Sequence, residues 1–119
     1  EILMTLNPAK FVHLNSGKRY SVENWPMHKQ VHAVAGVGNP NRFFDLLSRL
    51  GFEFDKSPFP DHHKYNKRDL YFLDHLPILM TEKDAAKCKH FNNSKIWYLS
   101  IEAKIESQFI DRLEEKIND

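Results

Sequence analysis

The most polar cluster of the sequence is Asp61-His62-His63-x-Tyr65, in a segment that also contains two prolines. A histidine titrates near neutral pH and can take up or release a proton during a reaction, and a neighbouring carboxylate such as Asp61 can orient it. Adjacent histidines point in different directions, and no cysteine or acidic pair completes a zinc spacing, so no metal site is predicted. A solvated loop, with Asp61 bonded to backbone amides and Tyr65 packed on a sheet edge, accounts for the same residues. Both interpretations stay open on the residues alone.

A second cluster is the turn Gly36-Val37-Gly38-Asn39-Pro40, which resembles half of a dinucleotide-binding fingerprint. The third glycine of that fingerprint is absent, and Arg42 lies close to where it would stand. We therefore favour a tight turn before a helix whose first residue is Pro40. Arg42 lies in the first helical turn, where a cation is unfavourable for the helix dipole, and this suggests that it meets an anion.

The third cluster, Thr81-Glu82-Lys83-Asp84, has the spacing of a capping box, with Thr81 at the N-cap. A helix start explains its polarity completely, so polarity alone is no evidence of function. The single cysteine, Cys88, falls on the same helix and is expected to pack in the core with Ala85.

The elements that position these clusters follow from hydrophobic patterning. The nearly unbroken apolar run at residues 31–37 predicts a central parallel strand. Apolar residues at helical spacing predict a helix from Pro40 to the stop at Gly51. Residues 52–54 are then expected to form a short strand, and residues 57–60 a loop, because neither of its prolines can donate to a ladder.

The second half of the chain repeats this alternation. Asn66 is expected to cap a helix that runs to Leu76, and residues 78–80 to form a third strand. A helix over residues 81–89, a strand over residues 96–99 that continues toward Ala103, and a closing helix over residues 109–117 complete the pattern.

The chain begins with two short predicted strands, residues 2–6 and 11–14, followed by a turn at residues 15–18. The alternation of strands and helices after residue 30 predicts the α/β class, as a small Rossmann-like three-layer domain with a mostly parallel sheet. In such sheets ligands meet the carboxyl ends of the strands, so residues 36–41, 61–65 and 81–84 should line one edge.

Composition excludes several classes of protein. The 119 residues suit one compact domain, and a formal net charge of +1 does not suggest nucleic-acid binding. No apolar run approaches the roughly 18 residues of a membrane span. The sequence also lacks a Gly-x-x-x-x-Gly-Lys-Ser/Thr phosphate loop and a Gly-x-Ser-x-Gly elbow. Because it opens on Glu1 within a strand pattern, we expect a segment of a longer protein.

Three stretches taken in order carry a resemblance to a known family: residues 31–44 (VHAVAGVGNPNRFF), 60–65 (PDHHKY) and 77–88 (PILMTEKDAAKC). With their spacing, they resemble the carboxyl-terminal part of tetraacyldisaccharide 4'-kinase, the lipid A kinase. The resemblance covers essentially the whole chain.

This resemblance implies an enzyme that uses ATP and Mg²⁺ to phosphorylate the 4'-hydroxyl of a lipid A precursor disaccharide at the cytoplasmic face of the bacterial inner membrane. It implies that a larger amino-terminal P-loop domain supplies the nucleotide site, the metal site and the membrane association. Residues 1–30 would then be a β lead-in and hinge-like connection to that domain, and residues 31–119 the carboxyl-terminal domain. The present chain alone would bind no ATP or metal and would be inactive.

The resemblance also implies roles for individual residues. His62 matches a histidine that works with a carboxylate of the amino-terminal domain to activate the acceptor hydroxyl, and Asp61 could orient it. The other matching positions are expected to line the substrate cleft: Asn39, Arg42, His63, Tyr65, Thr81, Glu82, Lys83 and Asp84. The alternative is a non-catalytic α/β module that binds a partner or a small molecule through the same loops.

Overall fold

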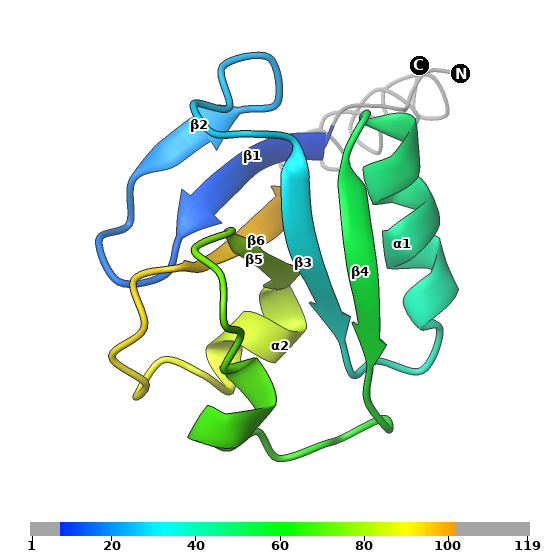
Figure 1. Cartoon of the computed structure of the whole chain (residues 1–119). Coiled ribbons are helices and arrows are strands. Elements are labelled where there is room, and N and C mark those ends of the chain that lie inside the picture. Colours follow the sequence, from blue (N-terminus) through cyan, green and yellow to red (C-terminus); the bar gives the residue numbers. More distant parts are fainter. Residues whose placement is uncertain (1–7, 102–119) are drawn as a thin grey trace, which may run out of the picture.

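The computed structural model describes residues 8–101, whose strands form one sheet in the order β2-β1-β6-β5-β3-β4 (Figure 1). The strands are β1 (Pro8–His13), β2 (Arg19–Ser21), β3 (Gln30–Ala35), β4 (Glu53–Pro58), β5 (Ile78–Thr81) and β6 (Ile96–Ile101). The described helices are α1 (Pro40–Arg49), α2 (Glu82–Ala86) and the 3₁₀ helix Lys67–Leu70. The strand predicted at residues 2–6 and the helix predicted at 109–117 lie outside the described residues.

The sheet is mixed but mostly parallel, which confirms the predicted α/β class. Strands β4, β3, β5 and β6 are parallel to one another, whereas β1 is antiparallel to β6 and β2 to β1. Between β1 and β2 the chain turns at Gly17, whose φ of 78° is accessible to glycine at no steric cost. Because β1 pairs directly with β6, β1 and β2 belong to the same sheet as the other strands. Whether residues 1–30 also act as a hinge stays a prediction.

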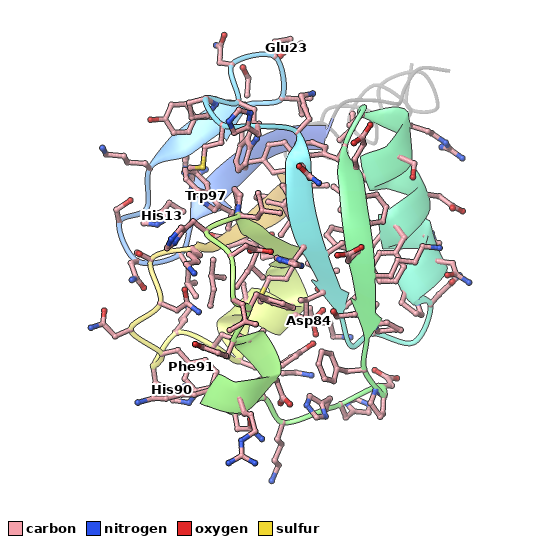
Figure 2. All side chains as sticks on the ribbon, viewed as in Figure 1. His13, Glu23, Asp84, His90, Phe91 and Trp97 are labelled. Atoms are coloured by element: carbon pink, nitrogen blue, oxygen red, sulfur yellow. The ribbon has the colours of Figure 1, made fainter. Side chains whose placement is uncertain are left out.

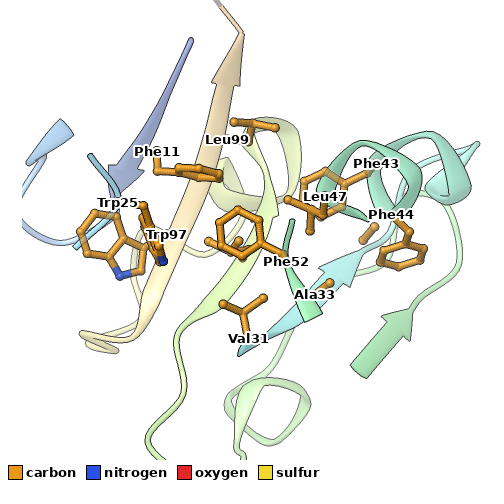
Figure 3. Close-up of a cluster of buried hydrophobic side chains, with 12 residues drawn as sticks. Phe11, Trp25, Val31, Ala33, Phe43, Phe44, Leu47, Phe52, Trp97 and Leu99 are labelled. Carbon is orange, nitrogen blue, oxygen red and sulfur yellow. The ribbon is translucent and has the colours of Figure 1, made fainter. Parts of the chain in front are cut away.

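The two α-helices cover opposite faces of the sheet. Alternate residues of a strand face opposite sides, so Val31, Ala33 and Ala35 of β3 pack beneath α1, while Val34 packs on the side of α2. Figure 3 shows the core on the α1 side, where Leu47 lies in one cluster with aromatic rings from β1, β6 and two loops: Phe11, Trp97, Trp25 and Phe52. This cluster contains both tryptophans, Trp25 and Trp97, as the aromatic anchors of the core.

Helix α1 begins and ends where the sequence indicates. Pro40 is its first residue, and Gly51, just beyond its end, has a φ of 92°. Strand β5 runs one residue further than predicted, to Thr81, and β6 reaches Ile101. Helix α2 is shorter than predicted, because it gives way to turns after Ala86.

The prediction of a loop at residues 57–60 is wrong for its first half. Strand β4 continues through Ser57 to Pro58, which pairs with Ala35 of β3. This is possible because β4 is an edge strand, where a proline removes no donor that a further strand would need. The amide of Phe59, not that of Pro58, donates to the Ala35 carbonyl at 2.8 Å.

The helix predicted from Asn66 to Leu76 is also wrong beyond its first turn. The Asn66 and Asp69 side chains form a capping box, but it opens only the 3₁₀ helix, and Tyr71 is already extended. Tertiary contacts account for the difference: Phe72 stacks on His32 of β3 with ring centroids 3.8 Å apart, and Asp74 bonds to the same imidazole.

None of the described helices has the length and apolarity that a membrane crossing requires.

Candidate functional site

The three polar segments meet at the carboxyl edge of the parallel strands, as the sequence predicts. The buried carboxylate of Asp84 joins them: it accepts hydrogen bonds from the Gly36 amide at 3.1 Å, the Tyr65 hydroxyl at 3.1 Å and the Thr81 hydroxyl at 2.7 Å. Figure 2 places Asp84 near the lower edge of the sheet, toward which the arrowheads of β3 and β4 point. A single carboxylate therefore connects the ends of β3 and β5 to the loop that follows β4.

Thr81 is the N-cap of α2, and its oxygen accepts a hydrogen bond from the Asp84 amide at 3.1 Å. In a full capping box the third helical residue would return its side chain to the N-cap amide. Here the Asp84 carboxylate turns instead to the Thr81 hydroxyl, Gly36 and Tyr65. The structural interpretation of Thr81 is confirmed, and Asp84 has a bridging role that the local sequence pattern does not reveal.

Tyr65 is buried beside this carboxylate. Burial, together with the charge and hydrogen bond of Asp84, raises the pKa of Tyr65 well above its ordinary value, so its hydroxyl keeps its proton and donates it. A Cβ at Gly36 would lie only 2.7 Å from the Tyr65 oxygen. The first glycine of the turn is therefore required for close approach. Since its amide is already bonded to Asp84, the structure supports the tight turn rather than a phosphate cradle.

His62 has an unusual backbone and an open side chain. Its φ of 65° is the one positive value among the non-glycine residues of the described part, and its side chain is 83% exposed. Such left-handed residues are strained and gather at functional sites. Its Nε2 lies 3.8 Å from Asp61 Oδ2, which is too long for a hydrogen bond. The imidazole is therefore presented outward with its nitrogens available.

His63 points elsewhere, as expected for neighbouring residues. Its Nε2 lies 2.8 Å from Asp69 Oδ2, and its ring stacks on Phe59 with centroids 4.5 Å apart. The hydrogen bond with His63 lowers the pKa of Asp69. His63 thus fastens the loop to the 3₁₀ helix, whereas the neighbouring His62 is exposed.

A hollow of about 480 Å³ lies beside this loop system, between the start of α1 and the start of α2. Five of the predicted cleft residues line it together with apolar residues: Asn39, Arg42, Thr81, Glu82 and Lys83, with Val37, Phe43, Leu46 and Leu99. The other predicted residues do not line it. His63, Tyr65 and Asp84 make the internal contacts described above, and Asp61 lies close to Gly38, where an added Cβ would be 3.4 Å from its Oδ2.

The charges around the hollow suit a ligand with both apolar and anionic parts. The N-cap residue of α1, Asn39, makes no capping hydrogen bond with its side chain, and the first turn holds no acidic residue. The positive end of the helix dipole therefore adds to the charges of Arg42 and Lys83, with Glu82 as the opposing charge. Within residues 8–101 no three metal-ligating side chains gather.

Two further groups have structural roles. Cys88 is buried, and burial raises its pKa to about 11. His32 is buried in β3 between Phe72 and Asp74, an arrangement that the scattered histidines of the sequence do not predict.

Comparisons with known proteins point to one family over nearly the whole chain. The family model LpxK, tetraacyldisaccharide-1-P 4'-kinase, matches residues 1–118. The tetraacyldisaccharide 4'-kinase of Ectopseudomonas mendocina is 44% identical over 112 residues, which are 94% of this chain and 34% of that protein. That of Alcanivorax borkumensis is 51% identical over 87 residues, which are 73% of this chain and 27% of that protein.

The fold agrees as well. The crystal structure of the "apo" form of LpxK from Aquifex aeolicus in complex with ATP superimposes with a TM-score of 0.57 at 21% identity, covering 76% of this chain and 27% of that one. The chain thus spans about a third of the length of the curated relatives that it matches. On the strength of the family match and these identities, the chain belongs to the tetraacyldisaccharide-1-P 4'-kinase family.

Proposed function

We propose that this chain is the carboxyl-terminal part of a kinase that transfers phosphate from ATP to the 4'-hydroxyl of tetraacyldisaccharide 1-phosphate in lipid A biosynthesis. Membership of the family supports the reaction, and the threefold greater length of the relatives supports a further domain. That domain, which we place on the amino-terminal side, would carry the P-loop. We place the whole enzyme at the cytoplasmic face of the bacterial inner membrane, with membrane association through the amino-terminal domain.

ATP and Mg²⁺ do not fit the residues described here. No three potential metal ligands gather in residues 8–101, and the Gly36 amide of the turn after β3 is bonded to Asp84. We therefore assign both to the amino-terminal domain. The 119-residue chain by itself should show no turnover with ATP and the disaccharide lipid, and turnover above a no-protein control would contradict this assignment.

His62 is the group that we assign to the chemistry. Phosphoryl transfer depends mainly on positioning and charge stabilisation, and a base near the attacking hydroxyl accepts its proton. The observation that carries this role is the left-handed, exposed His62 on a loop whose following residues, His63 and Tyr65, are held by polar contacts with Asp69 and Asp84. A carboxylate of the amino-terminal domain would orient the imidazole when the two domains close, and Asp61 would add its charge nearby.

The hollow beside α1 is the part that we assign to the acceptor. Its apolar wall matches an acyl or sugar face, and Arg42 and Lys83 match a phosphate group. Tyr65, Asp84 and His63 act by holding the loops and do not touch the substrate.

The decisive variant is His62→Asn in the full-length enzyme. Asparagine tolerates the left-handed backbone, so the fold is retained while the imidazole is lost. Turnover should fall by about 10²-fold, the usual scale of acid–base assistance, with a smaller change in KM. Lys64→Asn is the matched control, since Lys64 is an exposed neighbour. Full turnover in His62→Asn, or an equal loss in the control, would remove His62 from the mechanism.

A further inference from the structure

The segment after the 3₁₀ helix carries the two most exposed large apolar side chains among the described residues. Leu73 is 89% exposed and Tyr71 71%, whereas Met27, the third of this kind, is 39% exposed. Single exposed apolar residues are ordinary on protein surfaces. Two such residues in the same short segment form a local apolar surface that calls for a physical explanation.

Their exposure is imposed by the neighbouring residues. Tyr71 has extended backbone, with φ of −93° and ψ of 115°, so alternate side chains face opposite sides. Phe72 stacks on His32 at an interplanar angle of 8°, and Asp74 lies 2.8 Å from the His32 Nε2. Phe72 and Asp74 are thus both held against His32, whereas Tyr71 and Leu73 are left exposed.

The charged side chains of this segment differ in whether they have a partner. Both carboxylates are engaged internally: Asp69 with His63 and the Asn66 amide, and Asp74 with His32 and the Leu76 amide. The cations Lys67 and Arg68, in contrast, are exposed, and neither forms an ion pair with any described residue.

The exposed cations and the exposed apolar side chains lie close together in the chain. Residues three apart eclipse each other in a 3₁₀ helix, and the Tyr71 amide donates to the Arg68 carbonyl at 3.3 Å. Arg68 and Tyr71 therefore lie one helical turn apart. The four exposed side chains of Lys67, Arg68, Tyr71 and Leu73, here called the Tyr71 surface, are all cationic or apolar.

We propose that the Tyr71 surface docks on an anionic lipid surface. Tyrosine favours the headgroup region and leucine the acyl region, and each lysine or arginine near an anionic membrane adds attraction. A protein partner stays an outcome of the test, because lysine is depleted at protein interfaces whereas tyrosine and arginine are enriched there. This contact is separate from any membrane association of the amino-terminal domain.

Docking would have a consequence for the proposed kinase. His62 lies only a short loop before Lys67, so the contact would hold the candidate catalytic loop beside the membrane that contains an acylated acceptor. This consequence rests on the proposed function, whereas the docking itself does not. Vesicle binding can therefore be tested without ATP, and its failure would leave the kinase assignment intact.

The test is flotation of the full 119-residue chain with two kinds of vesicle, phosphatidylcholine alone and phosphatidylcholine mixed with phosphatidylglycerol. The chain should bind the mixed vesicles more tightly. Tyr71→Ser/Leu73→Ser should lower the partition coefficient about tenfold or more, the scale of losing two partly inserted side chains. Arg68→Gln should lower it about fivefold on mixed vesicles only.

Two control variants lie at the opposite edge of the molecule. Met27, between β2 and β3, and Arg49, at the end of α1, are exposed residues of matching character, far from the 3₁₀ helix at the lower edge of Figure 1. Met27→Ser and Arg49→Gln should bind like the unchanged chain. Melting temperatures check that each variant is folded, and Leu73→Ser alone replaces the double variant if that one is not.

Several results would overturn the proposal. Absence of binding to the mixed vesicles, equal binding to both kinds, or unchanged binding by the Tyr71 surface variants would each do so. Concentration-dependent self-association that the double variant abolishes, without vesicle binding, would instead assign the surface to a second copy of the chain.

Discussion

The hydroxyl of Tyr65 donates to the carboxylate of Asp84 across 3.1 Å in a fully buried contact. Since Asp84 also accepts from Gly36 of the turn after β3, this one contact fixes the His62 loop to the sheet. The loop of the candidate catalytic histidine is thus held by buried residues. Removing these contacts should first lower the free energy of unfolding.

Tyr65→Phe removes only the hydroxyl and leaves the ring in the core. One acceptor site of the buried carboxylate then lacks its partner, and the free energy of unfolding should fall by about 1–3 kcal/mol. Chemical denaturation measures the change. Tyr71→Phe is the matched control, because the Tyr71 ring is exposed, and its unfolding curve should be unchanged. Identical stability in Tyr65→Phe and the control would show that the contact does not contribute.

Thr81→Val should destabilise the fold by about 1 kcal/mol, the usual effect of losing an N-cap. The valine matches threonine in shape but can neither cap the Asp84 amide nor donate to the Asp84 carboxylate. Thr81→Ser keeps both hydrogen bonds and should lie close to the unchanged protein. If serine and valine were equally destabilising, the methyl group and not the hydroxyl would be the important part of Thr81.

The lowered pKa of Asp69 predicts that the free energy of unfolding changes with pH in the acid range. Its pKa in the folded protein is below the ordinary 3.8 because of the hydrogen bond with His63. A lowered pKa means that the folded protein binds fewer protons, so the stabilisation is fully present above about pH 4 and is lost as the pH falls through the folded value. Asp69→Asn should therefore be less stable than the parent at pH 7, and the difference should shrink below pH 4. A difference that does not vary with pH would contradict this account.

Cys88 should be inert toward thiol reagents in the folded protein at pH 8. Its pKa of about 11 leaves little thiolate, and the side chain is buried. Because Cys88 is the only cysteine, a colorimetric thiol assay reports on it alone. The same protein in denaturant is the control and should react at once. Rapid reaction without denaturant would mean that the structure around Cys88 opens readily.

The parts of the fold that could be predicted from sequence are those with strong local signals. The apolar run of β3 and the helical spacing after Pro40 each specify one structure, and the structure has both. The meeting of three polar segments at one edge followed from the general geometry of parallel sheets. These predictions needed no knowledge of distant contacts.

The errors arose where a distant partner decides the local structure. Residues 71–76 leave the predicted helix because His32, which precedes Asp74 by 42 positions, engages both Phe72 and Asp74. Pro58 can lie in a strand only because β4 is at the edge of the sheet, a fact of topology. The bridging role of Asp84 and the left-handed backbone of His62 likewise have no local pattern by which to recognise them.

The pairing of Pro8 with Ile101 places the two ends of the described chain side by side on neighbouring antiparallel strands. A force that pulls these two points apart would act across β1 and β6 from one end. The hydrogen bonds between β1 and β6 would then break one after another, because the force acts on only one of them at a time. The domain should therefore be mechanically weak along this direction, whatever its thermodynamic stability.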